Sequence, residues 1–373
     1  MKDITPRRVK VSGWRNRLAA SRRFQRWAAR FPLTRRITRN EGEQLFDLVS
    51  GFVYSQVLQA LVQLDALKDI AAKPVTPDDL AKKHEIDPAR MRVLLHAGVS
   101  VGLLKLKKPD RYALTQRGAS LLGVPGLEAL IRHHSVFYRD LQDPVALLRG
   151  DVETELSEFW PYVFEGPSAL PEDVAHTYSN LMADSQGLIA EDTLRFVSLK
   201  NVKRLMDVGG GSGAFLAVAG KAYPNLQMAL FDLPAVTSQA KDVLKAAKVW
   251  DRTEVIAGSF RKNDLPEGAD AISLVRVLYD HEDGTVKKLL ADVYAALPPG
   301  GRIIISEPMS GGQAPLRATD AYFAFYCMAM QTGQVRSSDK IAKFCENVGF
   351  IGIEKPKPFR PYVTSVVSAV KPI

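Results

Sequence analysis

The spacing of apolar residues divides the chain into a helical front half and a back half in which short apolar runs alternate with helices. Between residues 41 and 67, apolar side chains recur every three or four positions, which predicts one long amphipathic helix. Two shorter helices are expected to begin after Thr76 and Asp87, because each of these capping residues is followed by a proline.

A winged helix is the expected fold of residues 41–120. The runs Leu103–Leu106 and Tyr112–Leu114 alternate around a proline-containing turn, as the two strands of a wing do. Winged helices often bind DNA, but the second helix, residues 88–97, offers few side chains suited to reading bases. We therefore expect a dimerisation domain, with a DNA-binding regulator as the alternative.

Residues 121–195 form a helical segment that is rich in aromatic side chains. These residues either line an apolar substrate pocket or belong to the core: Phe137, Tyr138, Phe159, Trp160, Tyr162, Phe164 and Tyr178. His133 and His134 lie close to them in sequence. Because no third ligand occurs at metal spacing, we expect this pair to be polar groups of the pocket or surface and expect no metal.

After residue 196, short apolar runs alternate with helical stretches, which predicts an α/β domain whose parallel sheet carries helices on both faces. The five runs are Arg204–Val208, Gln227–Asp232, Thr253–Ala257, Ala271–Val277 and Arg302–Ser306. Two last runs, 351–354 and 362–370, flank a turn-rich segment and are expected to add an antiparallel edge.

A glycine-rich loop follows the first of these runs. Its glycines permit tight turns and close approach of a ligand to the backbone: Gly209, Gly211 and Gly213. The loop joins a strand to a helix, so we expect a nucleotide-like ligand at the carboxyl ends of the strands. The next strand ends in Asp232, whose carboxylate suits hydrogen bonds to the two hydroxyls of a ribose.

Asp207 favours S-adenosylmethionine over NAD as this ligand. The loop also satisfies the dinucleotide pattern, so the glycines alone leave both open. An acid at the start of the loop assists an ammonium and a sulfonium group, whereas it hinders a pyrophosphate.

The net charge of +9 originates in the first forty residues, which contain thirteen lysines and arginines and one acid. Phe24, Trp27 and Phe31 recur there at helical spacing among arginines. Such a helix over residues 14–31 is suited to peripheral contact with an anionic membrane. Packing on the same protein or on a partner chain is the alternative, and nucleic acid is a weaker one.

Two composition features limit the remaining possibilities. No run of eighteen uncharged apolar residues occurs, so we expect no membrane-spanning helix. Cys327 and Cys345 are the only cysteines, which excludes a disulfide framework and fits a reducing, cytoplasmic compartment.

Together these motifs resemble the S-adenosylmethionine-dependent O-methyltransferases of the plant-type, or hydroxyindole O-methyltransferase-like, family. The resemblance covers about residues 41–373 and rests on the winged helix and on Asp207–Gly213, Phe231–Pro234, Gly258–Phe260, Arg276–Asp283, Leu297–Glu307 and Gly333–Ser337. It implies a Rossmann-like class I methyltransferase domain over 196–373, preceded by a basic arm (1–40), a dimerising winged helix (41–120) and a substrate-pocket segment (121–195).

The resemblance also assigns roles to residues. Asp232 would hold the ribose, Ser259 and Phe260 would border the adenine, and Arg276 would contact the donor near a strand end. Asp207 and the three loop glycines complete the implied donor site. Met182, close to Ser185, would belong to a segment that closes over donor and substrate, with His133 and His134 nearby in the substrate pocket.

The chain departs from the family where its catalytic base lies. The family pattern is L-H-D-W-x-D, but here Leu278–Asp283 places Tyr279 at the histidine position, and His281 replaces the tryptophan. Glu307 matches an acid that orients the base, whereas Val335 occupies the second acid position. A neutral tyrosine is a poor base at pH 7, so Tyr279 and Glu307 would orient a hydroxyl, with His133, His134 and His281 in reserve as proton acceptors.

Loss of the histidine fits catalysis by approximation, or an aliphatic hydroxyl that loses its proton only as the new bond forms. The arm and the run Phe46–Val57 resemble the carotenoid hydroxyl O-methyltransferases of purple phototrophic bacteria, the demethylspheroidene or hydroxyneurosporene type. That resemblance implies methylation of a tertiary hydroxyl on an acyclic carotenoid, by a cytoplasmic homodimer that contacts the inner or photosynthetic membrane. An aromatic or polyketide hydroxyl is the alternative substrate, and a regulator that senses S-adenosylmethionine is the alternative from another class.

Overall fold

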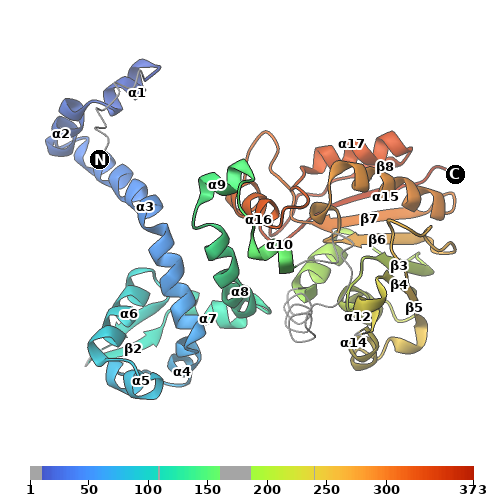
Figure 1. The fold of residues 1–373 in the computed structure, drawn as a ribbon, viewed down its shortest axis with the longest axis horizontal. Coiled ribbons are helices and arrows are strands. Elements are labelled where there is room, and N and C mark those ends of the chain that lie inside the picture. The colour runs from blue at the N-terminus through green and yellow to red at the C-terminus, as the bar shows by residue number, and fades with distance from the viewer. Residues whose placement is uncertain (1–10, 108–109, 160–185, 239) are drawn as a thin grey trace. The chain divides into compact units, whose positions relative to one another are not determined.

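The structure, a computed structural model, describes residues 11–107, 110–159, 186–238 and 240–373 (Figure 1). The chain divides into two compact units, Met1–Ser120 and Leu121–Ile373. The first unit is helical with a small wing, and the second contains the large sheet.

The first unit opens with two short helices and a long one. Helices α1 (Trp14–Ala19) and α2 (Arg22–Arg30) precede α3 (Arg35–Gln63) and α4 (Ala66–Ala72). The prediction of one helix over 41–67 was wrong at both ends. The helix begins six residues earlier and stops at Gln63, because Asp65 adopts a left-handed conformation (φ 50°) that an α-helix cannot contain.

The winged-helix elements are confirmed. Helix α5 (Pro77–His84) begins with a capping box between Thr76 and Asp79, and α6 (Pro88–Ser100) is capped by Asp87. Strands β1 (Leu104–Lys107) and β2 (Arg111–Leu114) pair in antiparallel register. Both capping signals were local in the sequence, which is why these helix starts could be predicted.

One face of α3 is apolar and open to solvent. Its exposed residues are Leu45, Phe46, Leu48, Val49, Phe52 and Val53. By length and composition α3 could also cross a membrane, although a helix that packs against protein passes the same test. The sequence expectation of no spanning helix therefore stays a prediction.

Unit 2 begins with a helical layer. Helices α7 (Gln116–Gly123), at the boundary of the units, and α8 (Leu127–Asp140) are followed by α9 (Pro144–Arg149) and α10 (Glu155–Phe159). Asp140 accepts hydrogen bonds from the amides of Glu155 and Leu156 and so fixes the start of α10. Four residues proposed for the pocket lie outside the described residues: Trp160, Tyr162, Phe164 and Tyr178. Phe159 ends α10, and the description does not extend to its side chain.

The sheet of unit 2 has seven strands in the order β5-β4-β3-β6-β7-β9-β8. They are β3 (Arg204–Val208), β4 (Gln227–Asp232), β5 (Thr253–Ala257), β6 (Ala271–Val275), β7 (Arg302–Glu307), β8 (Ile351–Glu354) and β9 (Ser365–Val370). The first five are parallel, and β9 pairs antiparallel with β7 and with β8. The predicted parallel sheet with an antiparallel edge is confirmed.

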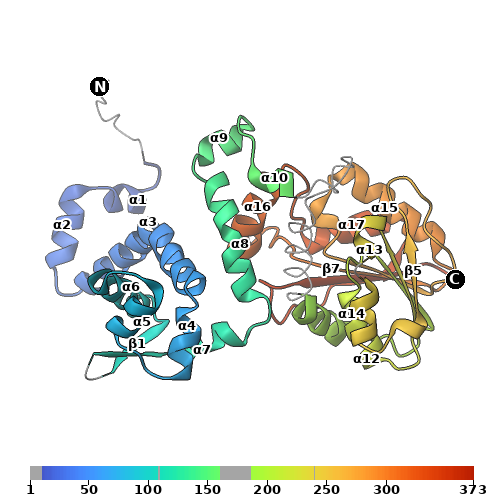
Figure 2. The same ribbon diagram turned by 60° about the horizontal axis from the view of Figure 1, so that its bottom comes forward.

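Helices cover both faces of this sheet (Figures 1 and 2). On one face, α12 (Ala214–Ala222) and α14 (Ala240–Ala246) contribute to one apolar core. On the other, α15 (Asp283–Ala296) and α17 (Ser338–Val348) contribute to a second core. Because successive residues of a strand point to opposite faces, Leu205 belongs to the first core and Met206 to the second.

The order of the strands determines where a ligand can bind. After β3 the chain moves outward to β4 and β5 and then returns to β6, on the opposite side of β3. This reversal opens a crevice at the carboxyl ends of β3 and β6, the usual binding position in such sheets.

Candidate donor and acceptor sites

The glycine loop is shaped by backbone conformations that favour glycine. Gly209, Gly211 and Gly213 have φ values of 69°, 60° and 77°. A β-carbon at Gly209 would lie 2.8 Å from Cγ2 of Val277, so the loop packs closely on the segment after β6. A β-carbon at Gly211 would meet no described atom within 4 Å, so this side of the loop is open to a ligand.

Asp232 lies at the end of β4 and supports the loop. Its carboxylate accepts one hydrogen bond from the amide of Gly211 and one from the amide of Leu233, each at 2.7 Å. Burial raises the pKa of Asp232, and these two hydrogen bonds oppose that effect. Each carboxylate oxygen can accept a further hydrogen bond, so the group is suited to a pair of neighbouring hydroxyls.

Asp207 lies beneath the loop rather than in the open crevice. It is fully buried, and the hydroxyl of Ser273 donates to its Oδ1 at 2.6 Å. Its Oδ2 has no hydrogen-bond partner in the part of the chain that the structure describes. Burial raises the pKa of Asp207 to about 7, against the effect of Ser273. A cationic ligand above the loop would favour the ionised form of this acid.

A second group of residues borders the crevice near β5. The amide of Ser259 donates to Oδ1 of Asn263 at 2.9 Å. Phe260 and His281 meet edge to face, with ring centroids 5.2 Å apart. Burial, together with the charges of Arg261 and Arg336, lowers the pKa of His281 to about 3, so its ring is neutral at pH 7.

The central feature of the site is a short 3-10 turn after β6, Leu278–Asp280, which we call the clamped turn. Oε2 of Glu307 accepts hydrogen bonds from the amides of Leu278 and Tyr279, at 2.9 and 3.1 Å. The guanidinium of Arg336 donates to the carbonyl of Leu278 at 2.8 Å and to that of His281 at 2.7 Å.

Gly333 and Asp283 complete the clamp. A β-carbon at Gly333 would collide with the carbonyl oxygen of Tyr279, so this contact requires glycine. Arg336 is itself buried and pairs with Asp283 at 2.7 Å. Asp283 stays partly exposed, so solvent screens this pair more than it would a fully buried one. The position of the turn is therefore fixed from several sides.

Arg276 and Tyr279 are held next to each other at the entrance of the turn. Arg276 has a positive φ of 59°, rare for this residue, and its amide donates to the carbonyl of Ser306 at 2.8 Å. Its Nη2 donates to the hydroxyl of Tyr279 at 3.4 Å. Burial raises the pKa of Tyr279 above its ordinary value, so this phenol is neutral at physiological pH.

An aromatic–histidine cluster lies on the other side of the turn. We use this name for His133, His134 and Phe137 of α8 with Tyr322 and Tyr326 of the segments η3 (Arg317–Phe323) and α16 (Ala324–Ala329). His133 Nε2 lies 2.9 Å from the hydroxyl of Tyr326, and His134 Nε2 lies 2.8 Å from that of Tyr322. The ring of Phe137 meets both tyrosines edge to face.

Burial keeps the histidines of this cluster neutral. It lowers the pKa of His133 to about 4 and also lowers that of His134. Nearby, Phe323 contacts the ring of Tyr279, and the thiol of Cys327 donates to the carbonyl of Tyr279. The clamped turn thus lies between the glycine loop, through Val277, and the aromatic–histidine cluster.

The structure brings most of the sequence-predicted residues to this one region. The glycines and Asp232 lie at the ends of β3 and β4 with Asp207 buried beneath the loop, and Phe260 packs on His281 beside Ser259. Glu307 lies beneath the turn and is fully buried, where it binds backbone amides rather than a side chain. Met182 and Ser185 lie outside the described residues.

Sequence reasoning passed over Asp280. It is the third residue of the clamped turn, one of its oxygens is buried without a hydrogen-bond partner in the described ranges, and burial raises its pKa to about 7. Its sequence signal was that it matches the first aspartate of the family pattern, beside the residue that replaces the family histidine. Within the described residues, no three His, Cys, Asp or Glu side chains gather in a way that would hold a metal ion.

Comparison with known proteins assigns both units. An O-methyltransferase domain family matches residues 138–351, and an O-methyltransferase dimerisation domain family matches residues 46–123. Demethylspheroidene O-methyltransferase of Cereibacter sphaeroides is 54% identical over 95% of this chain and 94% of its own. The enzyme of the same name from Rhodobacter capsulatus is 51% identical over 95% and 88%.

The fold is also found in solved structures. Human N-acetylserotonin methyltransferase in complex with SAM superimposes with a TM-score of 0.75 over 89% of this chain and 98% of that one. Its sequence is 22% identical, so this likeness shows the fold alone.

Replacement of Glu307 by glutamine should weaken the pH dependence of stability. Burial raises the pKa of Glu307 to about 8, so folding favours its protonated form and stability falls as the pH rises from about 5 to 8. Each such group contributes roughly 1 kcal/mol per pH unit in that window. Glutamine cannot ionise and keeps an oxygen for the two amides. Between pH 5 and pH 8 the Glu307→Gln variant should therefore lose less stability than the unaltered protein.

Urea unfolding at pH 5, 6, 7 and 8 measures this difference. The same titration of Glu346→Gln, an exposed glutamate of α17, controls for the change of chemistry. Parallel curves for Glu307→Gln and the unaltered protein would contradict the assignment of a buried, protonated acid at this position.

Proposed function

The chain belongs to the O-methyltransferase family, and on that premise we propose that it transfers a methyl group from S-adenosylmethionine to a hydroxyl of a carotenoid. The observation that carries the proposal is the 54% identity, over 95% of this chain, to a demethylspheroidene O-methyltransferase. By that likeness the acceptor is an acyclic carotenoid with a tertiary hydroxyl.

The donor would lie in the crevice at the carboxyl ends of β3 and β6. Asp232 would accept hydrogen bonds from the two ribose hydroxyls of the donor. Gly211 leaves the side of the loop open along which the donor would lie. Ser259 and Phe260 would border the adenine. S-adenosylmethionine would supply a methyl group that is already activated by a sulfonium.

Asp207 suits the charge of this donor. Its buried Oδ2 has no hydrogen-bond partner among the described residues. The glycine loop lies directly over this oxygen, since a β-carbon at Gly210 would be 2.6 Å from Oδ2. A negative charge there stabilises a nearby cation more strongly than it would in water. Arg276 would lie farther along, at the end of β6.

The acceptor hydroxyl would be positioned by the clamped turn. Tyr279 is neutral and hydrogen-bonded by Arg276, so it can orient a hydroxyl oxygen but cannot act as a strong base. Glu307 would act by fixing the backbone of Tyr279. Holding the oxygen near the methyl group and in line with the bond that breaks removes much of the entropic barrier.

We propose that the protein acts as a homodimer through its first unit. The match to the dimerisation domain family begins at residue 46, within the exposed apolar face of α3. We expect a second copy of the chain to cover this face. A face of this kind is stable in water when another chain covers it.

The arm is proposed to contact an anionic membrane, where a carotenoid would be dissolved. Residues 11–40 contain nine arginines and no acid. On α2, Arg23, Arg26 and Arg30 border a shallow groove with Trp27 and Phe31. Trp27 is 51% exposed, and its ring stacks on Phe31 at 4.9 Å. Guanidinium groups beside exposed aromatic rings suit phosphate headgroups and the boundary beneath them.

The substrate can be tested on pigments. Cells that make hydroxylated carotenoids should accumulate a methyl ether, heavier by one CH₂ group, when this protein is present. Mass spectrometry of extracts with and without the protein measures the change. Purified protein should methylate the same hydroxycarotenoids in preference to phenols, and preference for a phenol would overturn the proposed substrate class.

Asp232→Ala should weaken donor binding by more than about 100-fold, because two hydrogen bonds to a charged group contribute about 1.5–3 kcal/mol each. Calorimetry with S-adenosylmethionine and with its demethylated product measures the loss. Asp251→Ala, which removes an exposed acid just before β5, is the matched control and should bind normally. Equal affinity of the two variants would refute the ribose site.

Arg23→Gln with Arg26→Gln should reduce binding to vesicles that contain phosphatidylglycerol by roughly ten- to thirty-fold, at about 1 kcal/mol per arginine. Co-sedimentation measures it, and added salt should weaken binding further. Lys105→Gln with Lys107→Gln removes two exposed charges from the wing and serves as control. If the arginine variant instead lost its dimer mass in light scattering, the arm would be assigned to the partner chain.

A further inference from the structure

The clamped turn presents a carboxylate that the proposed mechanism does not use. Asp280 ends this turn, and its Oδ1 is buried without a hydrogen-bond partner in the described portion of the chain. Buried polar atoms are nearly always paired, so an unpaired one requires an explanation. A ligand hydroxyl that donates to this carboxylate from its accessible side would offset the cost.

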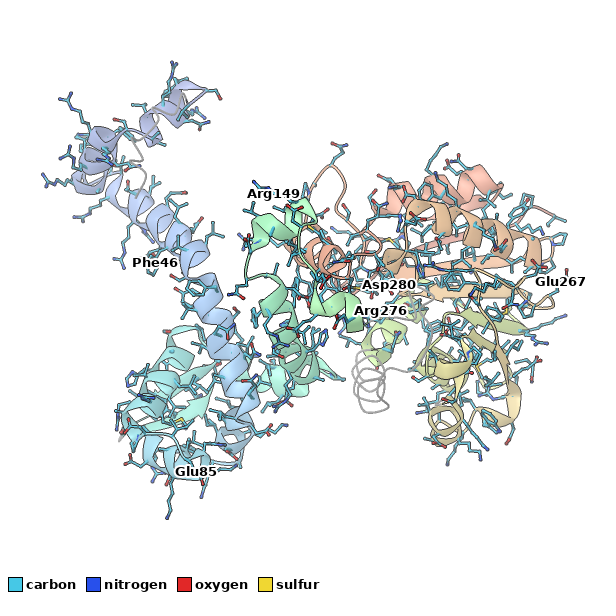
Figure 3. The ribbon with its side chains drawn as sticks, in the orientation of Figure 1. Phe46, Glu85, Arg149, Glu267, Arg276 and Asp280 are labelled. Atoms are coloured by element: carbon cyan, nitrogen blue, oxygen red, sulfur yellow. The ribbon has the colours of Figure 1, made fainter. Side chains whose placement is uncertain are left out.

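The position of Asp280 fits a role at the reacting oxygen. Through Val277 the segment packs on Gly209 of the donor loop, and through Tyr279 it contacts Phe323 beside the aromatic–histidine cluster. The reacting oxygen belongs to the acceptor and has to reach the methyl group of the donor. We therefore expect it to lie along this turn, between the two sites. Figure 3 shows Asp280 and Arg276 at the same end of the sheet of unit 2.

Accessibility distinguishes Asp280 from Glu307, the other acid of the turn. Glu307 is completely inaccessible, and its Oε2 already binds two backbone amides. Asp280 lies deep in the unit and its Oδ1 is buried, but the residue retains part of its surface accessible. Part of Asp280 is therefore open to an approaching substrate, whereas no part of Glu307 is.

We propose that Asp280 is the proton acceptor of the methyl transfer, in place of the histidine that Tyr279 replaces. The substrate oxygen forms a bond to the methyl carbon, the sulfur–carbon bond breaks, and its electron pair remains on sulfur. The hydroxyl proton passes to the carboxylate of Asp280 and later to water. This inference rests on the proposed function, since it specifies the acid–base group of that reaction.

A weak base is sufficient for an aliphatic hydroxyl. Such a hydroxyl is far too weak an acid to ionise beforehand, but its proton becomes strongly acidic as the oxygen gains a third bond. A carboxylate within reach can then accept it without prior ionisation of the alcohol. Other candidates are less suitable, because His281 is turned toward Arg261, and His133 and His134 are hydrogen-bonded to tyrosines.

The surroundings of Asp280 determine its titration. The titratable groups that act on it or feel its charge are Arg276, Tyr279, Glu307, Tyr326 and Cys327. Burial raises the pKa of Asp280 to about 7, and the charge of Arg276 lowers it. The carboxylate is the reactive form, so kcat/KM should rise as the pH passes through this pKa.

Asp280→Asn tests the inference. We expect kcat to fall by roughly 100- to 1,000-fold on any hydroxyl that the unaltered protein methylates, with donor affinity unchanged in calorimetry. The rise of kcat/KM near pH 7 should also disappear. In the donor-free protein, NMR of ¹³C-labelled aspartate should show a carboxyl resonance that titrates near pH 7 and is missing from the variant. Asp251→Asn, at an exposed aspartate, should change none of these.

Several results would overturn the inference. Activity of Asp280→Asn within threefold of the unaltered protein, with the same pH profile, would do so. If Asp280→Asn failed to fold, Asp280→Glu would decide, because it retains a carboxylate. In this variant kcat/KM should still rise with pH, but with its midpoint shifted from that of the unaltered protein. An unshifted midpoint would refute the role. Failure of the unaltered protein to methylate carotenoids would instead count against the proposed function, because the variant is compared on whichever hydroxyl is methylated.

Discussion

The hydrogen bonds that Glu307 and Arg336 make to the backbone of Leu278–His281 are the constraint on which the site depends. They satisfy the amides of Leu278 and Tyr279, and they add a second hydrogen bond to the carbonyl of Leu278, which already accepts from the amide of His281. Because both side chains are buried and Gly333 closes the remaining side, the turn has one position. That position determines where Tyr279 and Asp280 lie relative to the glycine loop, and so where two reactants could meet.

Burial, rather than added charge, sets the chemistry around this turn. Desolvation raises the pKa values of Asp207, Asp280 and Glu307 and lowers those of His133 and His281. The histidines are consequently neutral, while the acids titrate near physiological pH. A site with this balance carries little fixed positive charge on its histidines, which suits the approach of a cationic donor.

The features that local pattern encodes could be predicted from the sequence. The five parallel strands, the capped helices and the glycine loop each follow from neighbouring residues, and the structure places them within a few positions of the prediction. The clamp could not be predicted, because Glu307 and Arg336 lie 28 to 58 residues from the atoms that they bind. For the same reason Glu307 was expected to orient the side chain of a catalytic base, whereas it accepts hydrogen bonds from backbone amides. The end of α3 was missed because one left-handed residue, Asp65, overrides an apolar pattern that continues beyond it.

The paired histidines and tyrosines of α8, η3 and α16 have a consequence for how water wets the aromatic–histidine cluster. Their polar atoms are hydrogen-bonded to one another, so the cluster offers an entering molecule few free hydrogen-bond donors or acceptors. Water gains little from such a surface and is readily displaced by hydrocarbon. A substrate site bordered by this cluster would then select molecules as a partition solvent does, admitting an oily chain with one polar end and leaving hydrophilic metabolites outside, before any recognition of the reacting group begins.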